Sequence, residues 1–176
     1  SFNIVVANFP ESNIDGVQTR SDDGDRISKF VFDRLKTEMN SVASAQVWHD
    51  SVSAAEKGVS IGIITGASAE DRQASAKALA ESIGAHLVIY GDLKKSGSAA
   101  EWVPEFYVST AAVALTKEAE AEDILGRHQL GGAVAVPIPF KSEAGLVVDE
   151  QIRLRAVFVR GLLYDLIGLH EKALED

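Results

Sequence analysis

Cysteine is absent from the 176-residue sequence, which excludes disulfide bonds, thiol nucleophiles and cysteine-ligated metals. Basic residues are scarce as well: 17 Lys and Arg stand against 26 Asp and Glu, giving a net charge of −9. Because nucleic-acid binding requires a basic surface, we expect no nucleic-acid partner. No apolar stretch approaches the roughly 20 residues of a membrane span, so we expect no membrane contact by this chain itself.

The N-terminus begins with Ser1-Phe2-Asn3-Ile4 and carries neither a basic region nor a cleavage site. We therefore expect no signal peptide, and the compartment stays open between a cytoplasmic and an extracytoplasmic part of a larger protein. The hydrophobic fraction of 46% and the charged fraction of 24% are those of a folded globular domain. Length and composition together predict one domain with an appendage.

The first half of the sequence predicts two strands and a helix. Residues 3–9 are short, β-branched and followed by Pro10, which is typical of a buried strand. A helix is expected after Ser21, a good N-cap followed by acidic residues, with Ile27, Phe30, Val31, Leu35 and Met39 on one apolar face. Residues 45–48 predict a second strand, and residues 59–65 either a strand or an extended loop that ends at Gly66.

The second half predicts further elements of both kinds. A helix is expected from Ser68 to Gly84, followed by a strand over 86–93. We expect a Gly/Ser connection over 94–100 and a long strand over 102–115, with Pro104 near its start. The remaining expectations are a short acidic helix at 118–127, an apolar lid or connector at 130–140, a long helix at 143–167 and a new helix from Glu171.

This order of elements predicts an α/β fold with a mixed sheet of about four to five strands flanked by helices and followed by a C-terminal helical hairpin. We place the α/β domain at residues 1–142. Residues 143–176 are expected to begin a helical repeat that this sequence cuts short.

The C-terminal sequence RAVFVRGLLYDLIGLHEKALED resembles the start of a tetratricopeptide repeat (TPR). Gly161, Tyr164, Gly168 and Ala173 fall where that family places a small residue, an aromatic residue, a turn glycine and an alanine of the second helix. Arg160 departs from the pattern, because a large apolar residue is usual there. The resemblance implies a protein-binding scaffold that continues beyond Asp176, since a lone repeat buries too little surface to be stable.

The first 95 or so residues resemble bacterial domains that precede such repeats, similar to the TolB N-terminal domain and to CsgG-type proteins. The resemblance is carried by the segments NIVVANF, SKFVFDRL and AESIGAHLVIYGDL. It implies a non-catalytic sensor or adaptor in a bacterial signalling protein.

Catalytic and cofactor motifs do not assemble in this sequence. Residues 91–98 lack the lysine of a phosphate-binding loop, and the glycine-spaced stretch 58–66 does not match GxGxxG. The four histidines do not pair at metal-ligand spacing, and His49 and Asp50 are neighbours that point to opposite faces of an extended chain. We therefore expect no enzyme, no cofactor and no metal site, and read His86 as a structural residue.

The leading hypothesis is a non-catalytic protein–protein interaction or sensor module ahead of a TPR scaffold. The residues expected to contact a protein partner are Phe158, Leu162, Tyr164, Asp165, Trp102, Phe106 and Tyr107. The last three are aromatic residues around Pro104, and such a cluster also fits the edge of a core. A homodimer through the C-terminal helices is possible if Val157, Leu163, Tyr164 and Leu174 stay uncovered. The alternative is a small-ligand or nucleotide-binding regulatory domain, with its ligand near Asn8, Gly66 and Gly91 at strand ends.

Overall fold

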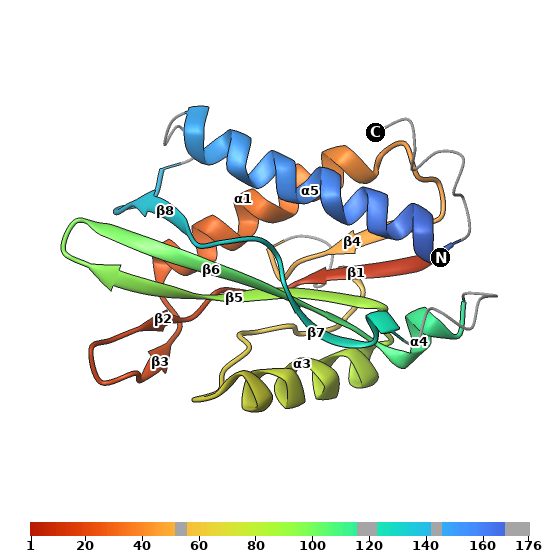
Figure 1. The fold of residues 1–176 in the computed structure, drawn as a ribbon, viewed down its shortest axis with the longest axis horizontal. Helices are drawn as coiled ribbons and strands as arrows, with labels where there is room; N and C mark the ends of the chain where they lie inside the picture. Colours follow the sequence, from red (N-terminus) through yellow and green to blue (C-terminus); the bar gives the residue numbers. More distant parts are fainter. Residues whose placement is uncertain (52–55, 116–122, 142–145, 168–176) are drawn as a thin grey trace.

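The structure is a computed structural model that describes residues 1–51, 56–115, 123–141 and 146–167. One mixed sheet of eight strands forms its middle layer (Figure 1). Strand β1 (Phe2–Val6) lies between β4 (Ala45–Trp48) and β5 (Leu87–Ser96) and runs parallel to both. The predicted strands at 3–9, 45–48 and 86–93 are thus confirmed, and the α/β class with them.

The far side of β5 pairs along its whole length with the antiparallel strand β6 (Ala99–Val108). Two short strands, β7 (Gly126–Gln129) and β8 (Val134–Pro137), then pair antiparallel with successive parts of β6. A small hairpin of β2 (Glu11–Ser12) and β3 (Gln18–Thr19) continues the sheet beside β5, beyond the end of β1. Strands β3 and β4 therefore lie at one edge of the sheet, and β7 and β8 lie at the other.

Helices cover both faces of the sheet (Figure 1). Helices α1 (Asp22–Met39) and α5 (Leu146–Leu166) lie on one face, and α3 (Ala69–Ile83) lies on the other. The short helix α4 (Thr110–Val113) follows β6. This arrangement explains the continuous apolar run in β1. Its alternate side chains enter the two hydrophobic cores, one on each face of the sheet, so both faces of the strand are buried.

The local signals for the two predicted helices are confirmed. Ser21 caps α1 by accepting a hydrogen bond from the Gly24 N–H, and Ser68 forms a reciprocal capping box with Asp71 at the start of α3. Gly84 ends α3 with a φ of 67°, in the left-handed region that favours glycine. Because α3 presents small buried residues, Ala76 and Ala80, it can pack closely on the sheet.

The β5–β6 hairpin corrects several predictions. The connection expected over 94–100 is mostly strand, and only Gly97 and Ser98 lie between β5 and β6. The strand expected over 102–115 ends at Val108, where Ser109 bonds to the Ala85 carbonyl and the chain turns into α4. Pro104 sits inside the sheet, opposite the gap between β8 and β7, so its missing N–H breaks no ladder bond; its carbonyl accepts from the Leu130 N–H.

The expected acidic helix and the expected lid are also wrong in part. Gly126–Gln129 is strand β7, whereas residues 116–122 lie outside the described residues. The predicted connector at 130–140 contains strand β8, in which Val134 and Val136 are buried and Ala135 and Pro137 are exposed. Residues 59–65 were predicted to form either a strand or an extended loop. They form the loop, which makes an isolated β-bridge between Asn8 and Ile63.

Helix α5 confirms the long C-terminal helix and contributes Val148, Ile152, Ala156, Val159 and Leu163 to the same core as α1 and β1. The boundary at 142/143 remains a prediction, although this packing makes α5 part of the α/β layer. The helix expected from Glu171, with Gly168, Ala173 and Leu174, lies outside the described residues. An added Cβ at Gly161 would meet nothing within 4 Å among the atoms of the described residues.

Candidate functional site

A buried polar network closes the end of β1 and β4. Ser28, which is 0% exposed, donates to Asn8 Oδ1 at 3.1 Å and lies 3.0 Å from His49 Nε2. The backbone N–H of Ser51 donates to His49 Nδ1 at 3.1 Å, so in the neutral ring the proton sits on Nε2. Burial lowers the pKa of His49, which keeps the ring neutral. His49 therefore gives its proton toward Ser28 and cannot accept the serine proton, so the pair does not act as a nucleophile and its base.

Asp50 anchors a loop over the same strand ends. Its carboxylate accepts from the Ile61 N–H and the Gly62 N–H, both at 2.8 Å, and from Asn8 Nδ2 at 3.0 Å. Asn8 is 2% exposed, and its backbone N–H donates to the Gly62 carbonyl. His49 and Asp50 thus serve different partners, as expected for neighbours on an extended chain.

The other two strand-end positions expected to meet a ligand are also filled. A Cβ at Gly66 would come within 2.5 Å of the backbone nitrogen of Arg72, and one at Gly91 within 2.5 Å of Trp102 Nε1. The third such position, Asn8, is held by hydrogen bonds with Asp50 and Ser28. These three positions are packed against other parts of the chain, and the alternative hypothesis, a ligand near these strand ends, remains a prediction.

A second polar cluster lies on the α3 face. Glu105, 3% exposed, accepts from Arg72 Nε at 3.0 Å and Nη2 at 2.8 Å, and from Arg127 Nη1 at 2.9 Å. These hydrogen bonds to Glu105 raise the pKa of Arg72. Tyr90 pairs with Glu105 across the strands, and burial raises the pKa of its phenol. The carboxylate of Glu105 in β6 thereby connects Arg72 of α3 with Arg127 of β7.

An apolar groove lies between α5 and the segment that joins β7 to β8. It has a volume of about 340 Å³, and we call it the α5 groove; its walls are Gln129, Leu130, Gly131, Leu154, Arg155 and Phe158. Leu154 is 50% exposed and Phe158 is 53% exposed, which are high values for large apolar side chains. The Phe158 ring contacts Phe106, whose ring stacks on His128.

Arg155 forms the polar wall of the α5 groove. Its guanidinium donates to the carbonyls of Leu130, Gly132 and Gln151 and to the Gln151 side-chain oxygen. All of these acceptors are uncharged, and burial lowers the pKa of Arg155 with no carboxylate to oppose the effect. Among the described residues, the groove therefore presents a cation without a counter-charge beside exposed apolar surface.

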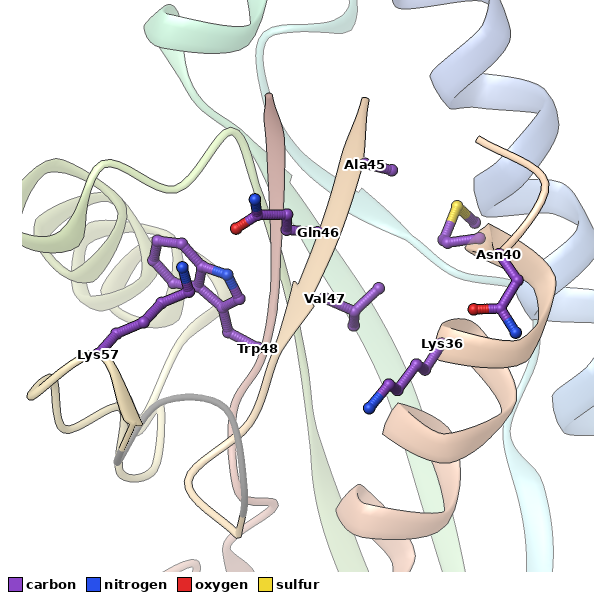
Figure 2. A pocket seen from close by; sticks show the side chains of 8 residues that line it. Lys36, Asn40, Ala45, Gln46, Val47, Trp48 and Lys57 are labelled. Carbon is purple, nitrogen blue, oxygen red and sulfur yellow. The ribbon is translucent and has the colours of Figure 1, made fainter. Parts of the chain in front are cut away.

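A second pocket, of about 250 Å³, lies at the opposite edge of the sheet, beside β4 (Figure 2). We call it the β4-edge pocket; its walls are Lys36, Met39, Asn40, Ala45, Gln46, Val47, Trp48 and Lys57. The Lys57 ammonium lies 4.9 Å from the centroid of the Trp48 ring. Figure 2 shows Gln46, Trp48 and Lys57 on one side of β4, and Lys36 and Asn40 on the other.

The residues expected to bind a partner separate into buried and exposed groups. Trp102 is 0% exposed and stacks on Phe9, whereas Phe106, Tyr107 and Tyr164 are 4%, 4% and 6% exposed. Trp102 and Phe106 enter one core and Tyr107 the other, so they form no surface cluster. Phe158 and Asp165 are exposed and Leu162 is half-buried. Because Leu163 and Tyr164 are covered within the chain, the reason given for a homodimer does not hold for them.

The sequence analysis missed Leu154, Arg155 and both lysines of the β4-edge pocket. The signal for Leu154 was present: with Phe158 and Leu162 it forms a row of large apolar side chains at four-residue spacing, of which Leu154 and Phe158 are exposed and Leu162 packs against the core. No local pattern marks Lys36 or Lys57, because the pocket joins residues from separate elements.

No family model matches the chain, and no curated protein matches it. Solved structures show a loose likeness. The LpoB C-terminal domain from Escherichia coli aligns with 12% identity over 74% of this chain and 81% of its own, at a TM-score of 0.37. The same domain from Salmonella enterica aligns with 12% identity over 78% and 82%, at 0.36. A PelC dodecamer from Paraburkholderia phytofirmans aligns with 10% identity over 92% and 88%, at 0.39.

At TM-scores this low we draw no functional argument from these three structures. None of them is described as a TPR, TolB or CsgG protein, so those resemblances stay expectations. Within the described residues, no helix has the length and apolar character needed to cross a membrane. The same residues contain no group of three or more His, Cys, Asp or Glu side chains placed to hold a metal ion.

Proposed function

We propose that this chain is a non-catalytic protein-interaction domain that holds a segment of a protein partner in the α5 groove. The observation that carries the proposal is the pair Leu154 and Phe158, each about half exposed beside a groove of about 340 Å³. Large apolar side chains of this kind supply much of the binding free energy in protein interfaces when a partner covers them. The enclosed Ser28–His49 pair supports a non-catalytic role.

Arg155 defines the chemistry of the partner. Its guanidinium is half-buried and, within the part of the chain that the structure describes, bonded only to uncharged oxygens, so a carboxylate from the partner would supply a counter-charge. The partner segment should therefore present a bulky apolar side chain next to an Asp or Glu. The further expectation that a TPR scaffold follows this domain rests on the spacing of Gly161, Tyr164, Gly168 and Ala173, and it remains part of the proposal.

The test is a selection from a random peptide library displayed on phage, with the wild-type chain as bait. We expect enriched peptides to carry an apolar residue beside an acidic one. The L154A/F158A variant should bind the enriched peptides at least tenfold more weakly, because it removes the anchor surface. The R155M variant should bind acidic peptides more weakly and lose the preference for them over their amide analogues.

Ile14 provides the matched control, since it is 100% exposed on the β2–β3 turn, away from the groove. I14A removes a similar amount of apolar surface and should leave peptide binding unchanged. If no sequence is enriched, or if the enriched peptides bind L154A/F158A as tightly as wild type, the α5 groove is not the docking site and the proposal is wrong.

A further inference from the structure

The β4-edge pocket lies at the opposite edge of the sheet from the α5 groove, and its walls differ in chemistry (Figure 2). Two of its wall residues are lysines, two are amides and one is a tryptophan, whereas none is acidic. In a chain with 26 acidic and 17 basic residues, a pocket with this set of side chains is locally positive. We propose that the β4-edge pocket binds a small molecule that carries a carboxylate or phosphate group next to an apolar part.

Neither pocket lysine has a carboxylate partner among the described residues. Lys29, Lys77 and Lys95 each lie within 4.0 Å of an acidic side chain, whereas Lys36 and Lys57 lie over aromatic rings. The ammonium of Lys36 is 5.7 Å from the Phe32 centroid. Both ammoniums can therefore donate hydrogen bonds to an anionic oxygen without first breaking an ion pair.

Lys36 has a second role that does not require a ligand. It lies in the last turn of α1, where a positive charge offsets the helix dipole. Lys57 lies on the side of β4 where Gln46 and Trp48 supply N–H donors (Figure 2), and Glu56 beside it does not line the pocket. Lys57 is therefore the side chain on which the anionic group of the ligand should depend most.

Trp48 provides the observation that points to a missing acceptor. The residue is 8% exposed, and its indole N–H is buried without a hydrogen-bond partner among the described residues. A buried donor without an acceptor is costly, and native proteins rarely leave one. Gln46 and Lys57 lie on the same side of β4 as this indole (Figure 2), so one oxyanion could receive donors from all three once the flexible Lys57 chain moves aside.

The other part of the pocket suits an apolar group. Met39, Ala45 and Val47 also line it, with Ala45 and Val47 on the Lys36 side of β4 (Figure 2), and the cavity of about 250 Å³ has room for a single ring. These features favour a compact ligand with one charged end, such as an aromatic or branched acid or its phosphate counterpart.

The test uses benzoate and phenyl phosphate as probes, with benzyl alcohol as the uncharged analogue and sodium chloride at matched ionic strength. The indole N–H signals of Trp48 and Trp102 are followed by ¹H–¹⁵N NMR during each titration. We expect benzoate, phenyl phosphate or both to shift the Trp48 signal, and the stronger of the two identifies carboxylate or phosphate as the preferred group. Trp102 is the internal control, because its indole is also unpartnered but lies in the core.

Three variants complete the test. K57M should raise the Kd of the anionic probe at least tenfold, and K36M should raise it less. K77M removes the same charge from the exposed Lys77–Glu81 pair and should leave the Kd unchanged. The proposal is overturned if neither anion shifts Trp48, if benzyl alcohol or chloride shifts it equally, or if K57M and K77M behave alike. None of these outcomes bears on the peptide selection for the α5 groove.

Discussion

Gly91 in β5 packs directly against the indole of Trp102 in β6, and an added Cβ at Gly91 would lie 2.5 Å from Trp102 Nε1 and 2.6 Å from the Val103 carbonyl oxygen. Trp102 is 0% exposed and stacks on Phe9 at a centroid distance of 4.9 Å, so it cannot move aside. The close approach of glycine to this ring therefore fixes where the largest side chain of the core lies.

Gly91→Ala should consequently destabilise the domain by about 1–3 kcal/mol, as expected for overpacking of a dense core. Urea unfolding followed by circular dichroism measures the change. Gly132→Ala is the control, because a Cβ there meets nothing within 4 Å, and its effect should stay within about 0.5 kcal/mol. Equal stabilities for the two variants would show that Trp102 does not need the space at Gly91.

Glu105→Gln should destabilise the domain by about 3 kcal/mol, since it leaves the guanidiniums of Arg72 and Arg127 facing each other without the carboxylate between them. The side chain of Glu105 is only 4% exposed, so water cannot replace the lost charge. Asp33→Asn removes a carboxylate from the exposed Lys29–Asp33 pair and should cost less than about 1 kcal/mol. Chemical denaturation of both variants tests the prediction; similar losses would contradict it.

Ser68→Ala should destabilise the domain by about 1 kcal/mol, because the Ser68 hydroxyl accepts the Asp71 N–H at the start of α3. Ser68→Gly should cost less, since glycine tolerates the N-cap conformation. Thermal unfolding of the two variants gives the order. If alanine and glycine destabilise equally, the capping box contributes nothing measurable to α3.

The elements that the sequence predicted well are those with local signals. Helices α1 and α3 have serine N-caps, and α5 has a long apolar periodicity, so nearest neighbours along the chain determine them. Strands β7 and β8 were missed because each has only four residues and exists through pairing with β6. That pairing depends on residues distant along the chain, which periodicity does not report.

The candidate sites were predictable only in part for the same reason. Phe158 and Leu162 were identified from the resemblance to a TPR, at positions that match its inward face, but the other wall of the α5 groove comes from Gln129–Gly131 in a different element. The aromatic residues Trp102 and Tyr107 looked like neighbours in sequence, yet strand alternation sends them into opposite cores. The order of the strands decides which side chains lie together, and that order could not be predicted from the sequence alone.

Lowering the pH should destabilise this domain from about pH 6.5 downward, through His49 and His86. Burial lowers the pKa of both imidazoles below the ordinary value of 6.5, with the N-terminal amine adding to the effect at His86. As pH falls through about 6.5, the unfolded chain takes up protons that the folded chain does not, so the free energy of unfolding decreases. Above that pH both states are neutral at these positions, and the contribution to stability is fully present.

His49→Gln isolates one part of this dependence, because glutamine can still donate to Ser28 and accept from Ser51 but does not titrate. The difference in the free energy of unfolding between about pH 7.5 and pH 5.5 should be smaller in the variant than in the wild type. The reduction can reach at most about 1.4 kcal/mol per pH unit for one group. Urea titrations at the two pH values give these differences, and H49Q/H86Q should reduce them further. An unchanged pH dependence in H49Q would mean that His49 takes up its proton equally in the folded and unfolded chain, so that the network around Ser28 does not hold the ring neutral.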